Sequence, residues 1–161
     1  MYGLSYRLKQ PTSIAAKIGS DSKNERISFK DAADSIKDVI RYTSVSSDAN
    51  YSRNYFLTKQ QLESQGYSEL RCRNYFQMYK DGKVNHKSIQ SIFSNANGVK
   101  FELQFQTDSS QAAKNLKIPL YEERRKSGLS ETRKKEIDKQ MRLLAEKVDD
   151  PKDVMAIRSH G

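Results

Sequence analysis

The sequence is poor in the residue types that build covalent or metal-linked frameworks. It has one cysteine, Cys72, and two histidines, His86 and His160, among its 161 residues. A single thiol excludes an internal disulfide framework and any metal site made of several cysteines. We expect Cys72 to be a small buried hydrophobic residue. His160, in a frayed end of the chain, is expected to be inert.

The sequence also lacks any apolar run whose length approaches the about 20 residues that a membrane-spanning helix needs. It shows no signal peptide and no lipidation motif. The hydrophobic share of 35% is lean but sufficient for one core. We therefore expect a single domain over residues 1–161, without membrane contact, in a reducing cytoplasm. Delivery by other machinery, or excision from a longer parent protein, stays open.

Positive charge is what the chain has in excess. It carries 29 Lys and Arg against 20 Asp and Glu, which gives a net charge of +9 and a pI near 9.6. Such a balance points to a polyanionic partner: nucleic acid, nucleotide phosphates, an acidic protein or a membrane surface. Charge alone selects none of them.

The most informative segment is residues 99–107, where apolar and polar side chains alternate. A period of two predicts a β-strand with one apolar face and one polar face. The polar face carries Glu102, Gln104 and Gln106, which are poor strand formers. It is interpreted in two ways. Either that face of the sheet is turned to water, or a carboxylate and two amides stand on the floor of a metal or substrate site.

Turn and helix signals place the other elements and predict an α+β fold with one mixed sheet of about five strands flanked by helices. Helices are expected at residues 11–18, 29–36, 50–65 and 109–126, with a last one beginning at Ser130. Strands are expected at residues 38–45, 69–77, 88–94 and 99–107. The last two should form a hairpin across residues 95–98, and residues 19–25 should be a loop.

A basic cluster opens the chain. Arg7 and Lys9 point the same way in an extended segment, and Lys17 lies one helical turn after Ser13. These cations converge near a helix N-terminus, which itself favours anions. The cluster is either a solvated basic edge or a phosphate site.

Two acids, Asp38 and Glu102, fall in predicted strands, and Arg71 and Arg73 share one face of another. Mg²⁺ takes one or two protein carboxylates and completes its shell with waters and phosphate oxygens. The cations, with Lys80 in the loop that follows, would neutralise the remaining phosphate charge. Taken alone, Asp38 also fits a plain strand-edge or cap residue.

The order of these motifs resembles the synthetase domain of the RelA/SpoT family, the alarmone synthetases. The resemblance covers residues 7–125 and leaves residues 127–161 as a C-terminal helical extension. The matching segments are Arg7-x-Lys9-x-x-x-Ser13-Ile14-x-x-Lys17, Asp38-Val39-Ile40, Arg71-x-Arg73-Asn74-Tyr75, His86-Lys87-Ser88-Ile89-Gln90 and Glu102-Leu103-Gln104-Phe105-Gln106-Thr107. It implies a nucleotidyltransferase-like synthetase fold.

The resemblance implies an ATP-dependent pyrophosphokinase that transfers the β,γ-pyrophosphate of ATP to the 3′-hydroxyl of a nucleotide. By this resemblance, ATP is held by Arg7, Lys9, Ser13 and Lys17, and Mg²⁺ is bound by Asp38 and Glu102. Glu102 also takes the hydroxyl proton, and Gln104 orients the Glu102 carboxylate. Phosphates are contacted by Arg71, Arg73 and Lys80, and His86 lies where the family stacks the acceptor base. Such transfer depends chiefly on positioning and charge neutralisation.

Three departures from the family pattern concern the acceptor. His86 replaces the stacking tyrosine, Gln90 the family histidine and Gln106 the family arginine. We therefore expect an adenine nucleotide in preference to a guanine nucleotide. Two alternatives stay open: pyrophosphorylation of the tRNA 3′ end, and a non-catalytic module that binds RNA or protein on the same fold.

A lone basic synthetase without a regulatory tail resembles the toxin-type members of the family. That likeness implies a neutralising immunity or antitoxin protein as a partner. It also implies action in the cytoplasm of a target cell, with delivery as the C-terminal domain of a larger secreted protein as one route.

Overall fold

The computed structural model describes residues 11–34, 36 and 40–161. Its strands are β1 (Arg41–Ser46), β2 (Tyr67–Asn74), β3 (Ile89–Asn95) and β4 (Lys100–Thr107). Its helices are α1 (Pro11–Glu25), α2 (Phe29–Asp34), α3 (Tyr51–Ser64), α4 (Tyr75–Lys80), α5 (Asp108–Arg124) and α6 (Glu131–Glu146). Two short 3-10 turns, η2 (Asp48–Asn50) and η3 (Val154–Ala156), complete the elements.

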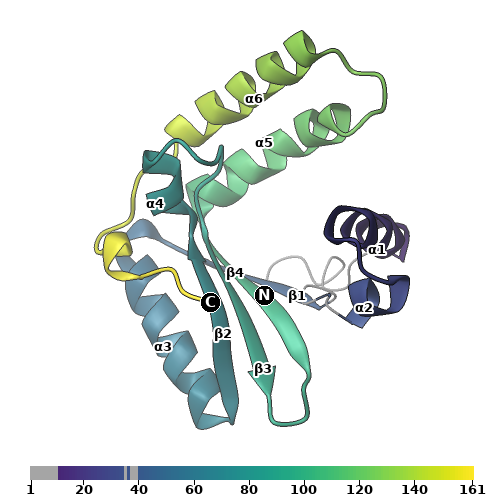
Figure 1. Ribbon diagram of the computed structural model, residues 1–161. Helices are drawn as coiled ribbons and strands as arrows, with labels where there is room; N and C mark the ends of the chain where they lie inside the picture. Colours follow the sequence, from purple (N-terminus) through teal and green to yellow (C-terminus); the bar gives the residue numbers. More distant parts are fainter. Residues whose placement is uncertain (1–10, 35, 37–39) are drawn as a thin grey trace.

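The described strands form one mixed sheet in the order β1-β4-β3-β2. β1 runs parallel to β4, while β3 is antiparallel to both β4 and β2 (Figure 1). The expected α+β class, a single mixed sheet flanked by helices, is confirmed; the described residues supply four strands where about five were expected. Within the described ranges, no helix has both the length and the apolarity to cross a membrane.

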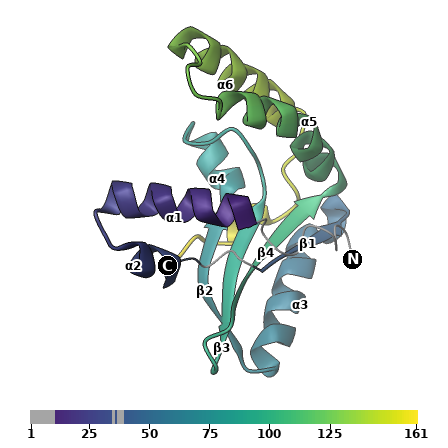
Figure 2. The same ribbon diagram turned by 90° about the vertical axis from the view of Figure 1, so that its right-hand side faces the viewer.

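The helices lie on both sides of this sheet. α3 packs along the face that carries Phe93, Leu103 and Phe105, where the main core forms around Tyr51 and Tyr55. Turned by 90°, the molecule shows α1 crossing in front of the sheet, with the α5–α6 hairpin above it (Figure 2). β4 is therefore an internal strand with neighbours on both edges and helices on both faces.

Local sequence explains the main turns. The β3–β4 hairpin closes as predicted, because Asn95 accepts hydrogen bonds from the backbone N–H groups of Asn97 (3.1 Å) and Val99 (3.0 Å). Gly98 takes the positive φ of 76° that this turn requires. Ser130 caps α6 by accepting from the Arg133 N–H at 3.2 Å, as the sequence predicted.

Two predicted boundaries were wrong. Residues 19–25 continue α1 as helix, so Gly19 does not break it. β2 ends at Asn74 and residues 75–77 begin α4, because the Asn74 carboxamide accepts from the Phe76 and Gln77 N–H groups at 3.0 and 3.2 Å. This side-chain cap starts a helix where apolar periodicity had extended the strand.

The C-terminal segment is docked, so the expectation of a frayed end at His160 was wrong. The backbones of Cys72 and His160 exchange two hydrogen bonds of 3.0 Å, and Asn74 donates to the carbonyls of Val154 and Ile157. Cys72 itself is fully buried, as expected. The tail therefore covers the free edge of β2, which would otherwise present unpaired backbone groups.

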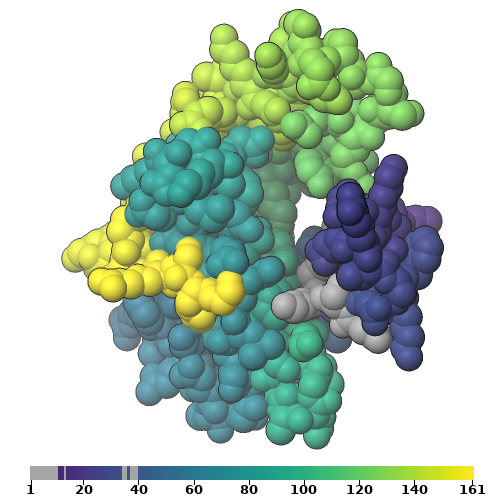
Figure 3. All heavy atoms as spheres, in the orientation of Figure 1, coloured from purple at the N-terminus to yellow at the C-terminus, as the bar shows by residue number. Residues whose placement is uncertain are grey.

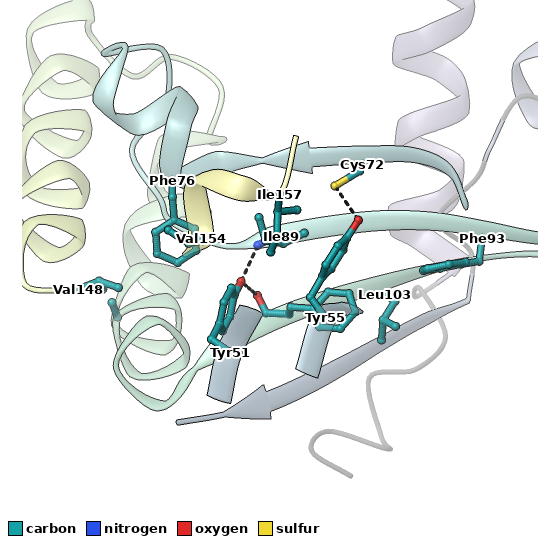
Figure 4. Close-up of a cluster of buried hydrophobic side chains, with 12 residues drawn as sticks. Tyr51, Tyr55, Cys72, Phe76, Ile89, Phe93, Leu103, Val148, Val154 and Ile157 are labelled. Atoms are coloured by element: carbon teal, nitrogen blue, oxygen red, sulfur yellow. Dashed lines mark hydrogen bonds between the residues drawn. The ribbon is translucent and has the colours of Figure 1, made fainter. Parts of the chain in front are cut away.

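Tyr51 ties the core to the sheet. Its hydroxyl accepts from the Ile89 N–H at 2.9 Å and donates to the Phe105 carbonyl at 2.8 Å, bridging β3 and β4 (Figure 4). Burial raises the pKa of the phenol, so it stays neutral.

We predict that Tyr51→Phe lowers the free energy of unfolding by about 2–4 kcal/mol, because two buried backbone groups lose their partner. Urea denaturation at pH 7 measures this. Tyr67→Phe is the matched control, since that ring only borders the core, and it should change stability by less than about 0.5 kcal/mol. Equal effects of the two variants would contradict the bridging role.

Candidate functional site

The polar face of β4 is buried. Glu102, Gln104 and Gln106 are 5%, 5% and 3% exposed, so the interpretation of a water-facing sheet was wrong. The polar face is covered because α5 follows β4 directly and folds back over it. A carboxylate and two amides therefore share one buried face of the sheet, and the second interpretation, a metal or substrate site on this face, stays a prediction.

A chain of contacts holds the Glu102 carboxylate. The parallel register sets Arg41 of β1 beside Glu102, and the Arg41 Nε lies 2.8 Å from the Glu102 Oε1. The Gln104 amide donates a short hydrogen bond to the same oxygen. Lys114 of α5 donates to the Gln104 Oε1 at 2.6 Å. One cation and one amide thus contact the carboxylate directly, and Lys114 supports the amide, as a buried carboxylate requires partners.

A cleft of about 1060 Å³ opens above this floor. It is bounded by the sheet, the loop after α4, α5 and α6. In the space-filling view the molecule is hollowed between α1, the sheet and α5 (Figure 3). Basic side chains dominate the lining over the acidic Glu122 and Asp138. They are Arg41, Lys83, Lys87, Lys114, Lys117, Arg124, Lys139 and Arg142.

His86 lies in the wall of the cleft, on the loop between α4 and β3. Its ring lies 4.3 Å from the ring of Tyr75, centroid to centroid, at an angle of 41°. Burial, with the positive charges of Lys117 and Lys114, lowers the pKa of His86 to about 4. At neutral pH the cleft therefore contains an uncharged imidazole on an aromatic support.

Two lysines of α5 point into the same cleft. Lys117 is 9% exposed and donates to the Asn85 carbonyl at 2.7 Å; burial and the charge of Lys87 lower its pKa to about 8. Lys114, one turn earlier, also has a lowered pKa, chiefly through burial. The two ammonium groups are therefore stripped of much of their hydration.

Several predicted site residues lie elsewhere or outside the described ranges. Arg7, Lys9 and Asp38 are outside the described residues. Ser13 and Lys17 belong to α1, whose Thr12 and Ala16 border a second hollow of about 420 Å³ with the end of α5.

Arg71 and Arg73 occupy the polar face of β2, in register with Ile92 and Gln90 of β3. Through Ile92 and Gln90 they share a face with Glu102 and Gln104. Arg73 also reaches the His160 carbonyl at 3.4 Å.

Lys80, at the end of α4, pairs with Asp150 at 3.1 Å. The residues that line the cleft do not include it. Its contact therefore joins α4 to the segment after α6.

Three residues of the site, Arg41, Lys114 and Lys117, were not predicted from the sequence. Arg41 could be found only from the pairing of β1 with β4, which links distant segments. The lysines carried a weak local signal: positions 110, 113, 114 and 117 share one helical face, and Ser110 and Ala113 on it are small and buried. A lysine on the buried face of a helix is rare unless a partner or a ligand binds it.

The side-chain ligands of the site are compatible with Mg²⁺ but not with a metal site built from protein side chains alone. Among the described residues, no three His, Cys, Asp or Glu side chains gather to hold a metal. Mg²⁺ needs only one or two carboxylates when phosphates and waters supply its other ligands. Glu102 is buried in contact with Arg41 and Gln104, which line the cleft, and it offers such an oxygen.

The fold is that of the small alarmone synthetases, as the motif order implied. Small alarmone synthetase 2 from Bacillus subtilis aligns with a TM-score of 0.60 at 18% identity, over 87% of this chain and 71% of that one. Small alarmone synthetase 1 from Bacillus subtilis, bound to its product pppGpp, aligns with a TM-score of 0.57 at 14% identity, over 87% and 70%.

The Type VI effector Tas1, in complex with its immunity protein, aligns with a TM-score of 0.50 at 11% identity, over 86% of this chain and 77% of that one. No protein-family model matches the sequence, and no curated protein matches it either.

The pKa of His86 predicts acid sensitivity. The folded state holds the ring neutral down to about pH 4, whereas the unfolded ring binds a proton near its ordinary pKa of 6.5. Its contribution to stability is thus complete above about pH 6.5 and is lost, by up to about 3 kcal/mol, as pH falls towards 4. Urea unfolding across this range should show a shallower pH slope in His86→Gln.

An NMR titration in which the His86 ring protonates near pH 6.5 would contradict the buried, neutral imidazole.

Proposed function

We propose that the chain is an ATP-dependent pyrophosphokinase that transfers the β,γ-pyrophosphate of ATP to the ribose 3′-hydroxyl of a nucleotide. The observation that carries the proposal is the buried Glu102 carboxylate, which contacts Arg41 and Gln104, two residues that line a basic cleft. The shared fold of enzymes that make such products adds support.

In the proposed reaction the acceptor 3′-oxygen attacks the β-phosphorus of ATP. The bond between that phosphorus and the oxygen bridging to the α-phosphate breaks, so AMP leaves with the bond's electron pair. The hydroxyl proton passes to the Glu102 carboxylate. Gln104 keeps that carboxylate oriented, and the cleft cations offset the negative charge on the phosphate oxygens.

Glu102, with Asp38 as its predicted partner, would hold Mg²⁺ with the phosphates of ATP. The ion would neutralise phosphate charge and polarise the transferred group. Arg7, Lys9, Ser13 and Lys17 are proposed to bind ATP, and Arg71, Arg73 and Lys80 to contact phosphates, as the motif resemblance implies. The pairing of Lys80 with Asp150 means that Lys80 would have to exchange that partner for a phosphate.

For the acceptor we propose an adenine nucleotide. His86 presents a neutral ring to the cleft, and the amides of Gln90 and Gln106 line it nearby. An amide can both donate to and accept from an adenine edge. The resemblance places a different set, with tyrosine, histidine and arginine, at these positions in guanine-using relatives.

We predict that Glu102→Gln lowers the rate of AMP release from ATP by about 100- to 10,000-fold, because it removes both the proton acceptor and the anionic metal ligand. Chromatography of reactions with ATP, Mg²⁺ and each candidate nucleotide measures the rate. Mass spectrometry of the products identifies the acceptor, and radiolabel on added tRNA would identify RNA as the acceptor instead.

Glu69→Gln is the matched control. Glu69 is also a buried carboxylate, but it faces the α3 side of the sheet, where Tyr55, Lys59 and Ser91 bind it. This variant should lose stability yet keep AMP release within about threefold when assayed below its unfolding transition. A folded, fully active Glu102→Gln protein would refute the assignment of Glu102.

We further propose a toxin-like role that consumes ATP in a target cell and is held in check by an acidic immunity protein. The basic charge of the chain and the shared fold with an effector that binds an immunity protein support it. Induced expression in bacteria should arrest growth and deplete ATP, whereas Glu102→Gln should do neither. Growth arrest by both proteins would point to toxicity without catalysis.

A further inference from the structure

Lys114 and Lys117 differ from three other cations of the cleft in what they contact. Arg41 pairs with Glu102, Lys87 with Asp150 at 3.0 Å, and Arg124 with Asp138 at 2.7 Å. Lys114 and Lys117 instead reach neutral oxygens, the amide of Gln104 and the carbonyl of Asn85. Among the described residues no carboxylate lies within salt-bridge distance of either lysine, although the negative charge of Glu102 acts on Lys114.

This arrangement is unfavourable for the protein alone. The lysines stand one helical turn apart on α5, buried or half-buried, and share the cleft with the positive charge of Lys87. Burial and like charge each disfavour an ammonium group. An anion bound between them would relieve both costs, and α5 gives the two groups a rigid spacing for it.

We propose that Lys114 and Lys117 form a subsite for the 5′-phosphates of a nucleoside diphosphate or triphosphate acceptor. The identification of this ligand as the acceptor rests on the proposed function, whereas binding of its phosphates does not require turnover. Lys114 lies next to Gln104, so the subsite begins beside the reacting carboxylate and extends along α5 towards His86. A terminal phosphate with two negative charges matches two ammonium groups that hydrogen-bond to neutral oxygens.

Ion pairs neutralise part of the outer surface of the helical hairpin, which argues for a mononucleotide over RNA. There Arg133 binds Glu123 at 2.7 Å, and Lys134 binds Glu131 at 2.6 Å. RNA binding needs a row of cations that can each take a phosphate. Lys114 and Lys117 lie inside the cleft instead, where a small ligand fits.

Calorimetric titration of ADP, AMP and adenosine into the Glu102→Gln protein tests the subsite without turnover. Adding Lys114→Gln or Lys117→Gln should each weaken ADP binding by about 10- to 100-fold, weaken AMP binding less, and leave adenosine binding unchanged. Lys117→Arg, which keeps the charge, should restore most of the ADP affinity. Lys134→Gln is the charge-matched control outside the cleft, where Lys134 pairs with Glu131, and should bind ADP normally.

Equal weakening of ADP and adenosine by Lys117→Gln would overturn the proposal, since it would mean a damaged cleft. Unchanged ADP binding in both lysine variants, or tRNA that displaces ADP at lower concentration than ATP does, would overturn it too. ADP binding that depends on the two lysines in a protein that releases no AMP would support the subsite and refute the pyrophosphokinase reaction.

Discussion

The site depends on one constraint: β4 is buried on both faces while one of those faces is polar. Phe101, Leu103 and Phe105 pack on the α3 side, so the intervening polar side chains must turn towards α5. A buried carboxylate is tolerated only with partners of opposite charge. The parallel strand β1 supplies Arg41 at the matching register, and α5 supplies Lys114 through Gln104. The floor of the cleft follows from this requirement.

The sequence predicts local features well here and non-local ones poorly. The β3–β4 hairpin, the cap of α6 and the order of the elements all rest on patterns within a few residues, and they hold. The burial of Glu102 and its contact with Arg41 depend on a parallel pairing between distant strands, which no local pattern specifies. The motif resemblance anticipated the fold and singled out Glu102 and Gln104. It could not supply α5 lysines that lie outside its motifs.

Asn74 shows how one polar side chain can decide a boundary that hydrophobic periodicity misplaces. Its carboxamide accepts two N–H groups at the start of α4 and donates to two carbonyls near η3. Full use of both amide atoms makes it a fixed junction between the sheet, α4 and the C-terminal tail. The tail is also anchored by Val154 and Ile157, which are buried in the main core. Such long-range satisfaction of a single amide leaves no trace in composition or periodicity.

The distribution of charge, more than its sum, indicates what the molecule binds. A net charge of +9 suggested several kinds of polyanion. Ion pairs on the outer faces of α5 and α6 neutralise some of the cations that an RNA backbone would meet. In the cleft, the ammonium groups of Lys114 and Lys117 hydrogen-bond to neutral oxygens. Electrostatic attraction is stronger in such a partly dehydrated site than on a solvated surface. The excess charge is thus most effective inside the cleft.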